Sequence, residues 1–222
     1  MEEEKMKRQI TLEEISDGRL YGLNDMVKAD CKGCTGCSAC CQGMGESIIL
    51  TPLDIYRLEQ GLNLSFGELM IDKIELHVVD GLILPNLKML SETERCAFLD
   101  PVGRCTIHAC RPDICRLFPL GRFYEEQGFR YFLQVHECPK TDRAKIKVKK
   151  WLDIPDLKQH ERFIQDWHDY LNKKEAALEG AEEELRKQVT MQLLKQFYIR
   201  PYDTNSDFYS QFYARMEEDE SI

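Results

Sequence analysis

The stretch CKGCTGCSACCQGMG, residues 31–45, decides how this chain folds, because it concentrates five cysteines and four glycines in fifteen positions. A core helix or strand would not tolerate this glycine density, so the segment is predicted to be a loop. Four of its cysteines follow the spacing C-x2-C-x2-C-C: Cys34, Cys37, Cys40 and Cys41. Cys31 continues the same three-residue spacing upstream. Two-residue gaps bring both sulfurs of a pair to one side of the turn, where they can reach one ion.

A second group of cysteines follows downstream: Cys96, Cys105, Cys110, Cys115 and Cys138. The chain therefore has ten cysteines in 222 residues, and none after Cys138. Two clusters of this kind are a strong signal for a metal site. Two other interpretations stay open at this point: buried thiols without a function, and a disulfide relay, since thiols of low pKa can act as redox sensors.

Composition limits the class of protein. The chain has 30 basic and 39 acidic residues, a net charge of −9, which argues against a basic nucleic-acid binder. Its first residues, MEEEKMKRQI, carry charges where a signal peptide needs an apolar core. No apolar run approaches the roughly 20 residues of a membrane span. We therefore expect a cytoplasmic protein with reduced thiols, and neither nucleic acid nor a membrane as its partner.

The expected fold class is α+β. A small cysteine-rich core, organised by metal and containing short β-hairpins and helices, is followed by a helical C-terminal region. The predicted boundaries are an N-terminal extension at 1–30, a cysteine-cluster metal-binding domain at 31–140, and a helical region at 141–222 that packs on this domain. Removal of the metal is then expected to collapse residues 31–140, because ligand binding is coupled to folding.

Local signals predict the individual elements. Thr51-Pro52 is typical of a helix start, and Ser65 is a second candidate N-cap. Asp80-Gly81 between apolar runs predicts a hairpin, and so does the alternation over 122–135. Further predicted elements are a turn at 100–103, a short helix that starts at 111–113, and helices over 157–171, 178–197 and about 208–213.

The two cysteine blocks together resemble the YkgJ-type cysteine-cluster family, a zinc- or iron-chelating domain recognised by its CxxCxxCC motif. Here that motif is Cys34-Thr35-Gly36-Cys37-Ser38-Ala39-Cys40-Cys41. The second block of the family is matched by Cys96, Cys105, Arg111-Pro112 and Cys115-Arg116-Leu117-Phe118-Pro119. The resemblance covers about residues 31–140. It implies a ligand set of Cys34, Cys37, Cys40, Cys41, Cys96, Cys105 and Cys115, with Cys138 as the eighth. Cys31 and Cys110 fall outside the pattern and are expected to be spare or auxiliary thiols.

Eight thiolates could complete two tetrahedral zinc sites or hold iron–sulfur clusters, so both cofactors stay open. The triple spacing is closer to that of cluster-binding ferredoxins than to that of zinc fingers. A flagellin lysine methylase that is similar around its cysteine motif is also linked with an iron–sulfur cluster. The resemblance implies metal binding without a settled reaction. Two alternatives are a redox or protein-modifying enzyme that uses an iron–sulfur cluster, and a metal carrier or assembly factor, which implies a protein partner.

Other polar residues near the cysteines have simpler expected roles. His108 and His136 could ligate a metal, but with so many cysteines nearby they are expected to lie at the surface or beside the ligands. The remaining histidines, including His160, are expected to be solvated. Arg111, Arg116 and Arg122 are expected to offset the negative charge of the thiolates, with an anionic ligand as the alternative.

Overall fold

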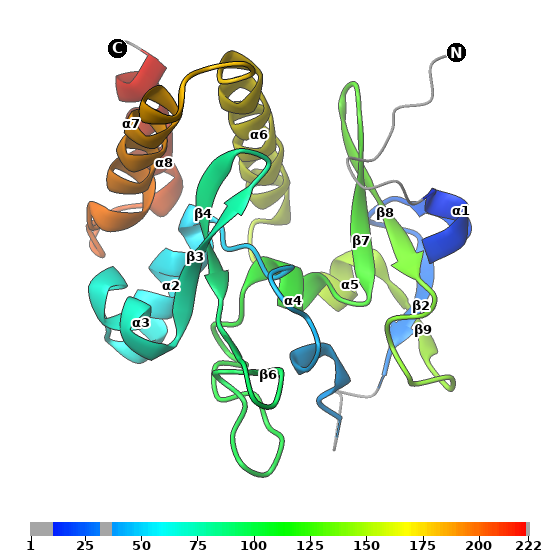
Figure 1. The fold of residues 1–222 in the computed structure, drawn as a ribbon. Helices are drawn as coiled ribbons and strands as arrows, with labels where there is room; N and C mark the ends of the chain where they lie inside the picture. The colour runs from blue at the N-terminus through cyan, green and yellow to red at the C-terminus, as the bar shows by residue number, and fades with distance from the viewer. Residues whose placement is uncertain (1–10, 32–36, 221–222) are drawn as a thin grey trace.

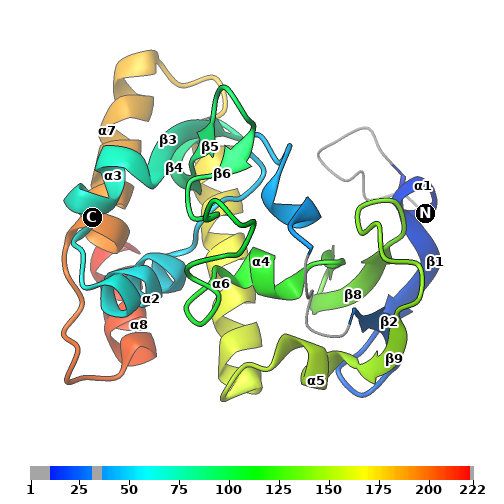
Figure 2. The ribbon, with the colours of Figure 1, turned by 90° about the horizontal axis from the view of Figure 1, so that it is seen from below.

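The computed structural model describes residues 11–31 and 37–220 and has the predicted mixed α+β fold. Two groups of elements lie on either side of the short helix α4 (Asp113–Leu117), as Figures 1 and 2 both show. Each group encloses its own cluster of buried apolar side chains, which we call the helical core and the sheet core. Whether a metal organises the fold between them stays a prediction.

The helical core is formed by α2 (Pro52–Leu62), α3 (Phe66–Asp72), α6 (Leu157–Ala177), α7 (Glu183–Leu194), a π-helical turn (Lys195–Ile199) and α8 (Phe208–Glu220). The predicted helix starts at Thr51 and Ser65 are confirmed. The backbone N–H of Asp54 donates to Thr51 Oγ1 at 3.2 Å, and the Asp54 carboxylate accepts from Thr51 in return. This capping box satisfies backbone donors that a helix start leaves free. Among the described residues, every helix is too short or too polar to span a bilayer.

A β-hairpin packs on these helices. Strands β3 (Ile74–Val79) and β4 (Leu82–Leu87) pair in register around the turn at Asp80-Gly81, which confirms the predicted hairpin. Both turn residues have positive φ, 51° at Asp80 and 85° at Gly81, as a two-residue type I′ turn requires. Leu82, Leu84 and Leu87 point into the helical core, so much of the segment 48–107 belongs to the same core as the C-terminal helices.

The sheet core combines strands that precede the first cysteine with strands that flank Cys138. A short helix α1 (Leu12–Ile15) leads into β1 (Ser16–Tyr21), which pairs with β8 (Gly128–Gln134), and β8 pairs with β7 (Leu120–Glu125). A second pair joins β2 (Met26–Asp30) to β9 (Ala144–Lys147), and α5 (Val148–Leu152) follows. Residues 16–30, predicted to be an N-terminal extension, thus pair with strands far along the chain. The hairpin predicted over 122–135 is confirmed.

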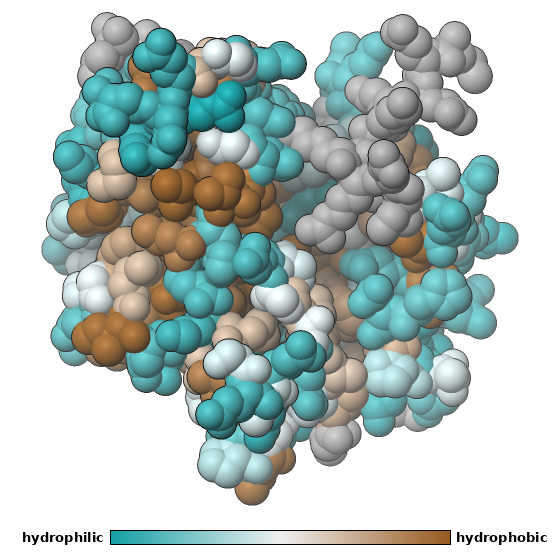
Figure 3. All heavy atoms as spheres, in the orientation of Figure 1, coloured by the Kyte–Doolittle hydropathy of each residue, from teal (hydrophilic) through white to brown (hydrophobic). Residues whose placement is uncertain are grey.

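One face of the molecule carries exposed apolar side chains. Ile71 is 75% exposed on α3 and Val78 is 70% exposed on β3. Figure 3 shows apolar surface in this region, where α3 and the β3–β4 hairpin lie in Figure 1. These side chains bury little surface, so they add little to the stability of the helical core.

Candidate metal centre

Three segments carry cysteines into the space between the two cores. The first is the 3₁₀ turn η2 (Ala39–Cys41), and the second is β6 (Arg95–Cys96), which pairs with β5 (Met89–Leu90). Backbone contacts join them, because the N–H of Gly43 donates to the carbonyl of Glu94 at 2.8 Å and Gln42 forms a β-bridge with Arg95. Cys41 and Cys96 are thereby held on neighbouring segments.

The loop after β6 turns back and brings Cys105 close to Cys96. Asp100 Oδ1 accepts from the N–H groups of Val102 and Arg104 at 3.0 and 2.7 Å, which closes the predicted turn at 100–103. Leu99 and Cys105 face each other in an isolated β-bridge. The loop is tied back to β6 by Arg95, whose guanidinium donates to the carbonyl of Asp100 at 2.9 Å. Cys105 is therefore fixed opposite Cys96.

The third segment is α4, which carries Cys115 and is anchored by a buried polar network. The N–H of Asp113 donates to Asp54 Oδ1 at 2.8 Å, and the Asp113 carboxylate pairs with Arg122 and with His160 Nε2, at 2.6 Å from the latter. His160 is 1% exposed, so the expectation that it is solvated is wrong. Arg122 offsets the charge of Asp113, and its guanidinium holds the pKa of that carboxyl well below its usual range. The network links α2, α6 and β7 to the cysteine segment.

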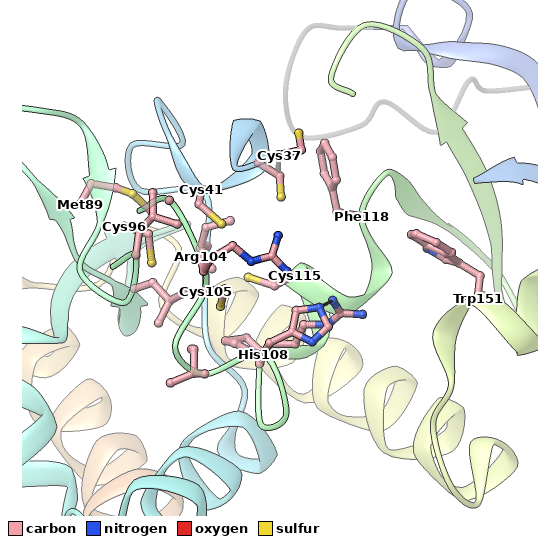
Figure 4. A pocket seen from close by; sticks show the side chains of 18 residues that line it. Cys37, Cys41, Met89, Cys96, Arg104, Cys105, His108, Cys115, Phe118 and Trp151 are labelled. Carbon is pink, nitrogen blue, oxygen red and sulfur yellow. Dashed lines mark hydrogen bonds between the residues drawn. The ribbon is translucent and has the colours of Figure 1, made fainter. Parts of the chain in front are cut away.

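These three segments enclose a cavity of about 100 Å³, which we call the main pocket. Figure 4 shows Cys41, Cys96, Cys105 and Cys115 reaching into one space from different segments. The lining also includes apolar side chains and the polar side chains of Arg104, His108 and Arg111. Six of the predicted ligands line the pocket: Cys37, Cys40, Cys41, Cys96, Cys105 and Cys115.

The sulfurs in the main pocket lie close enough to feel one another's charge. The pKa of Cys40 is lowered to about 7, first because the Cys41 thiol donates a hydrogen bond to it, with a further contribution from Arg111. The same contact raises the pKa of Cys41. Burial raises the pKa of Cys115, and charges on Cys96, Asp54, Cys40 and Cys105 raise it further. Without a cation, repulsion between the thiolates therefore disfavours ionising several cysteines of the pocket at once. A bound cation would offset this repulsion.

The donors fit zinc or iron in kind, since sulfur is the ligand that structural zinc and iron–sulfur clusters share. Their spacing is more open than a bound ion would require. In the described part of the chain, no three Cys, His, Asp or Glu side chains converge closely enough to hold an ion as they stand. Binding would have to draw the sulfurs together, as expected where metal binding and local folding are coupled.

Comparison with known families identifies this region. Residues 33–142 match the model of the family described as "CxxCxxCC: Putative zinc- or iron-chelating domain". This segment belongs to that family. No curated protein and no solved structure matches the chain. The family resemblance drawn from the two cysteine blocks is thus confirmed, and the matched segment contains every cysteine except Cys31.

Not all cysteines of the CxxCxxCC domain meet in the main pocket. Cys138 instead lines a second cavity of about 20 Å³, together with Cys31, Cys37 and Cys40. Cys110 lies in a third hollow beside Arg57 and Arg116, and its side chain packs against Gly61 of α2. Cys34 lies outside the described residues.

Two features of the site escaped the sequence reasoning. Arg104 lines the main pocket, and the sequence does not predict this, because a position after a turn gives no signal of where the side chain points. His160 did carry a signal. It shares the helical spacing of Phe163, Ile164 and Trp167, so the periodicity already places it on the buried face of α6.

Proposed function

We propose that the CxxCxxCC domain of this chain binds iron or zinc through the thiolates of the main pocket. The observation that carries the proposal is the meeting of cysteines from η2, β6, the following loop and α4 around one cavity. These segments are separated by up to about seventy residues in sequence, and a reduced thiol cluster of this kind is typical of a metal site. The family description supports the same chemistry.

The surroundings of the pocket suit an anionic metal–thiolate group. Arg111 contributes to the lowered pKa of Cys40 and limits the rise that burial causes in the pKa of Cys105, which offsets part of the charge that several thiolates accumulate. The pocket is also lined by Ile48, Leu87 and Met89, and apolar side chains of this kind limit access of water. Outer residues of this kind tune both the charge and the exposure of a bound metal.

Of the two cofactors, we propose an iron–sulfur cluster first. A cavity of about 100 Å³ is several times larger than the roughly 10–15 Å³ that one water needs, so it has room for a group of several atoms. Zinc is the second candidate, because four of the sulfurs would suffice for one tetrahedral ion. We also place the protein in the reducing cytoplasm, a proposal supported by the free thiols of Cys37, Cys40, Cys41, Cys96, Cys105, Cys110, Cys115 and Cys138.

The test is anaerobic purification followed by elemental analysis and an absorption spectrum. Iron with matching acid-labile sulfide and a broad visible absorption band would support the iron–sulfur proposal. Colourless protein with stoichiometric zinc would replace it with the zinc proposal and leave metal binding intact. Protein that contains neither metal, and takes up neither on anaerobic reconstitution, would refute the proposed function.

A further inference from the structure

The second cavity brings together cysteines that are far apart in sequence. Cys31 follows directly after β2, and Cys138 precedes β9. These two strands are antiparallel partners, with Asp30 opposite Ala144, so the end of β2 that leads into Cys31 lies beside the end of the loop that carries Cys138. Both line the small cavity of about 20 Å³, and Cys37 completes a set of three sulfurs around it. Strand pairing, rather than motif spacing, creates this arrangement.

The second cavity adjoins the main pocket but is distinct from it. Phe118, Cys37 and Cys40 line both, whereas Cys31 and Cys138 line the second cavity and not the main pocket. Lys140 lies at the second cavity and can offset thiolate charge there, as Arg111 does at the main pocket. Cys31 and Cys138 thus belong to the second cavity alone, and each cavity has a basic side chain in its lining.

We propose that the chain holds two separate metal centres, and that Cys31, Cys37 and Cys138 supply thiolate ligands to the second one. The inference rests on the proposed function and extends it to Cys31, which lies outside the matched family segment. Three thiolates suit a thiophilic cation such as zinc or iron, and three protein ligands leave a coordination position for a further group. The main pocket keeps Cys40, Cys41, Cys96, Cys105 and Cys115.

The experiment compares single cysteine variants by metal content. Full-length wild type, Cys31→Ser, Cys138→Ser, Cys115→Ser and Cys110→Ser are stripped of metal and titrated anaerobically with Co²⁺ alone. Bound metal is counted by elemental analysis, and thiolate ligation is followed by the sulfur-to-cobalt charge-transfer absorption. Cys110→Ser is the matched control, because Cys110 lines neither cysteine cavity.

We expect Cys31→Ser and Cys138→Ser each to lose about half of the bound cobalt, and Cys110→Ser to keep all of it. Cys115→Ser should lose the other half, and the double variant Cys31→Ser/Cys115→Ser should lose nearly everything. Retention of the far-UV circular dichroism spectrum identifies variants that still fold. Having two variants in the second centre keeps the test valid if one of them fails to fold.

Three other outcomes would count against the proposal. If Cys31→Ser and Cys138→Ser bind as much cobalt as wild type, the second centre does not exist, while the main pocket still stands. If Cys31→Ser and Cys115→Ser each abolish all binding, the sulfurs form one shared centre. If wild type takes up neither cobalt in this titration nor iron or zinc on anaerobic reconstitution, the proposed function has failed and the second centre fails with it.

Discussion

The helical core and the sheet core of this molecule are held together in different ways. In the helical core, aromatic rings from α6, the π-helical turn and α8 pack edge to face, as in Phe163–Phe212 with ring centroids 4.7 Å apart. The sheet core is smaller and depends on pairing between strands from opposite ends of the cysteine region, such as Tyr21 with Tyr131. The cysteines lie between them, on turns and short elements that bury few apolar side chains of their own.

This difference indicates where a metal would matter. The helical core can form without it, because its apolar contacts come from long helices and a regular hairpin. The main pocket has less of this support, because only single side chains of its loops, such as Phe98 and Ile107, reach the helical core, and charge repulsion between its thiols opposes closure. Metal binding and apolar packing would therefore stabilise different parts of the same chain.

The largest expected effect comes from removing the metal. Binding at structural zinc sites is worth about 10–16 kcal/mol, more than any single side chain contributes. We expect a chelator to increase amide hydrogen exchange strongly in residues 37–45 and 92–117 and to leave α6 nearly unchanged. This is narrower than the collapse of residues 31–140 predicted from sequence, because α2, α3 and the β3–β4 hairpin belong to the helical core. If hydrogen exchange also rises in α6, the helical core depends on the metal as the main pocket does.

The second effect concerns the helical core itself. Phe163 is fully buried and contacts Phe208, Tyr209 and Phe212. Truncation to alanine should lower the free energy of unfolding by about 3–5 kcal/mol, measured by urea denaturation with circular dichroism. Val78→Ala is the control, since that side chain is 70% exposed and its loss should change stability by less than about 0.5 kcal/mol. Equal losses in both variants would contradict the assignment of the core.

The same contrast explains how much could be predicted from sequence. Local signals of a few residues predicted two helix starts and a hairpin, at Thr51, Ser65 and Asp80-Gly81. The structure confirms each of them. The pairing of β1 with β8 and of β2 with β9 could not be predicted, because partners far apart in sequence leave no local signal. The grouping of the cysteines around two cavities leaves no local signal in the sequence either. Spacing predicts a metal site near Cys37, but the pairing of β2 with β9 and the loop before β9 bring Cys31 and Cys138 to the same small cavity.

The third prediction tests the polar network that joins the helical core to the cysteine segment. His160→Ala removes one of the partners of the buried Asp113 carboxylate and should lower the free energy of unfolding by about 1–3 kcal/mol. Urea denaturation measures this loss, and hydrogen exchange should rise around Cys115, because Asp113 anchors that turn. The matched control is His136→Ala, since His136 is exposed and its loss should cost less than about 0.5 kcal/mol. A variant that unfolds like the control would show that the network does not anchor α4.

The smallest effect is a pH dependence in the sheet core. Burial, together with the hydrogen bond that Tyr21 donates to Asp17, raises the pKa of Tyr21 to about 12. In the unfolded chain a tyrosine loses its proton near pH 10, so between about pH 10 and 12 the folded state binds more protons. Stability is therefore fully present below about pH 10 and falls as the pH rises towards 12. Tyr21→Phe removes this contribution while the other tyrosines titrate alike in both proteins. Urea midpoints measured at pH 8 and pH 11 should shift in favour of the phenylalanine variant at the higher pH. A parallel decline in the two proteins would mean that the Tyr21 hydroxyl titrates as it does in the unfolded chain.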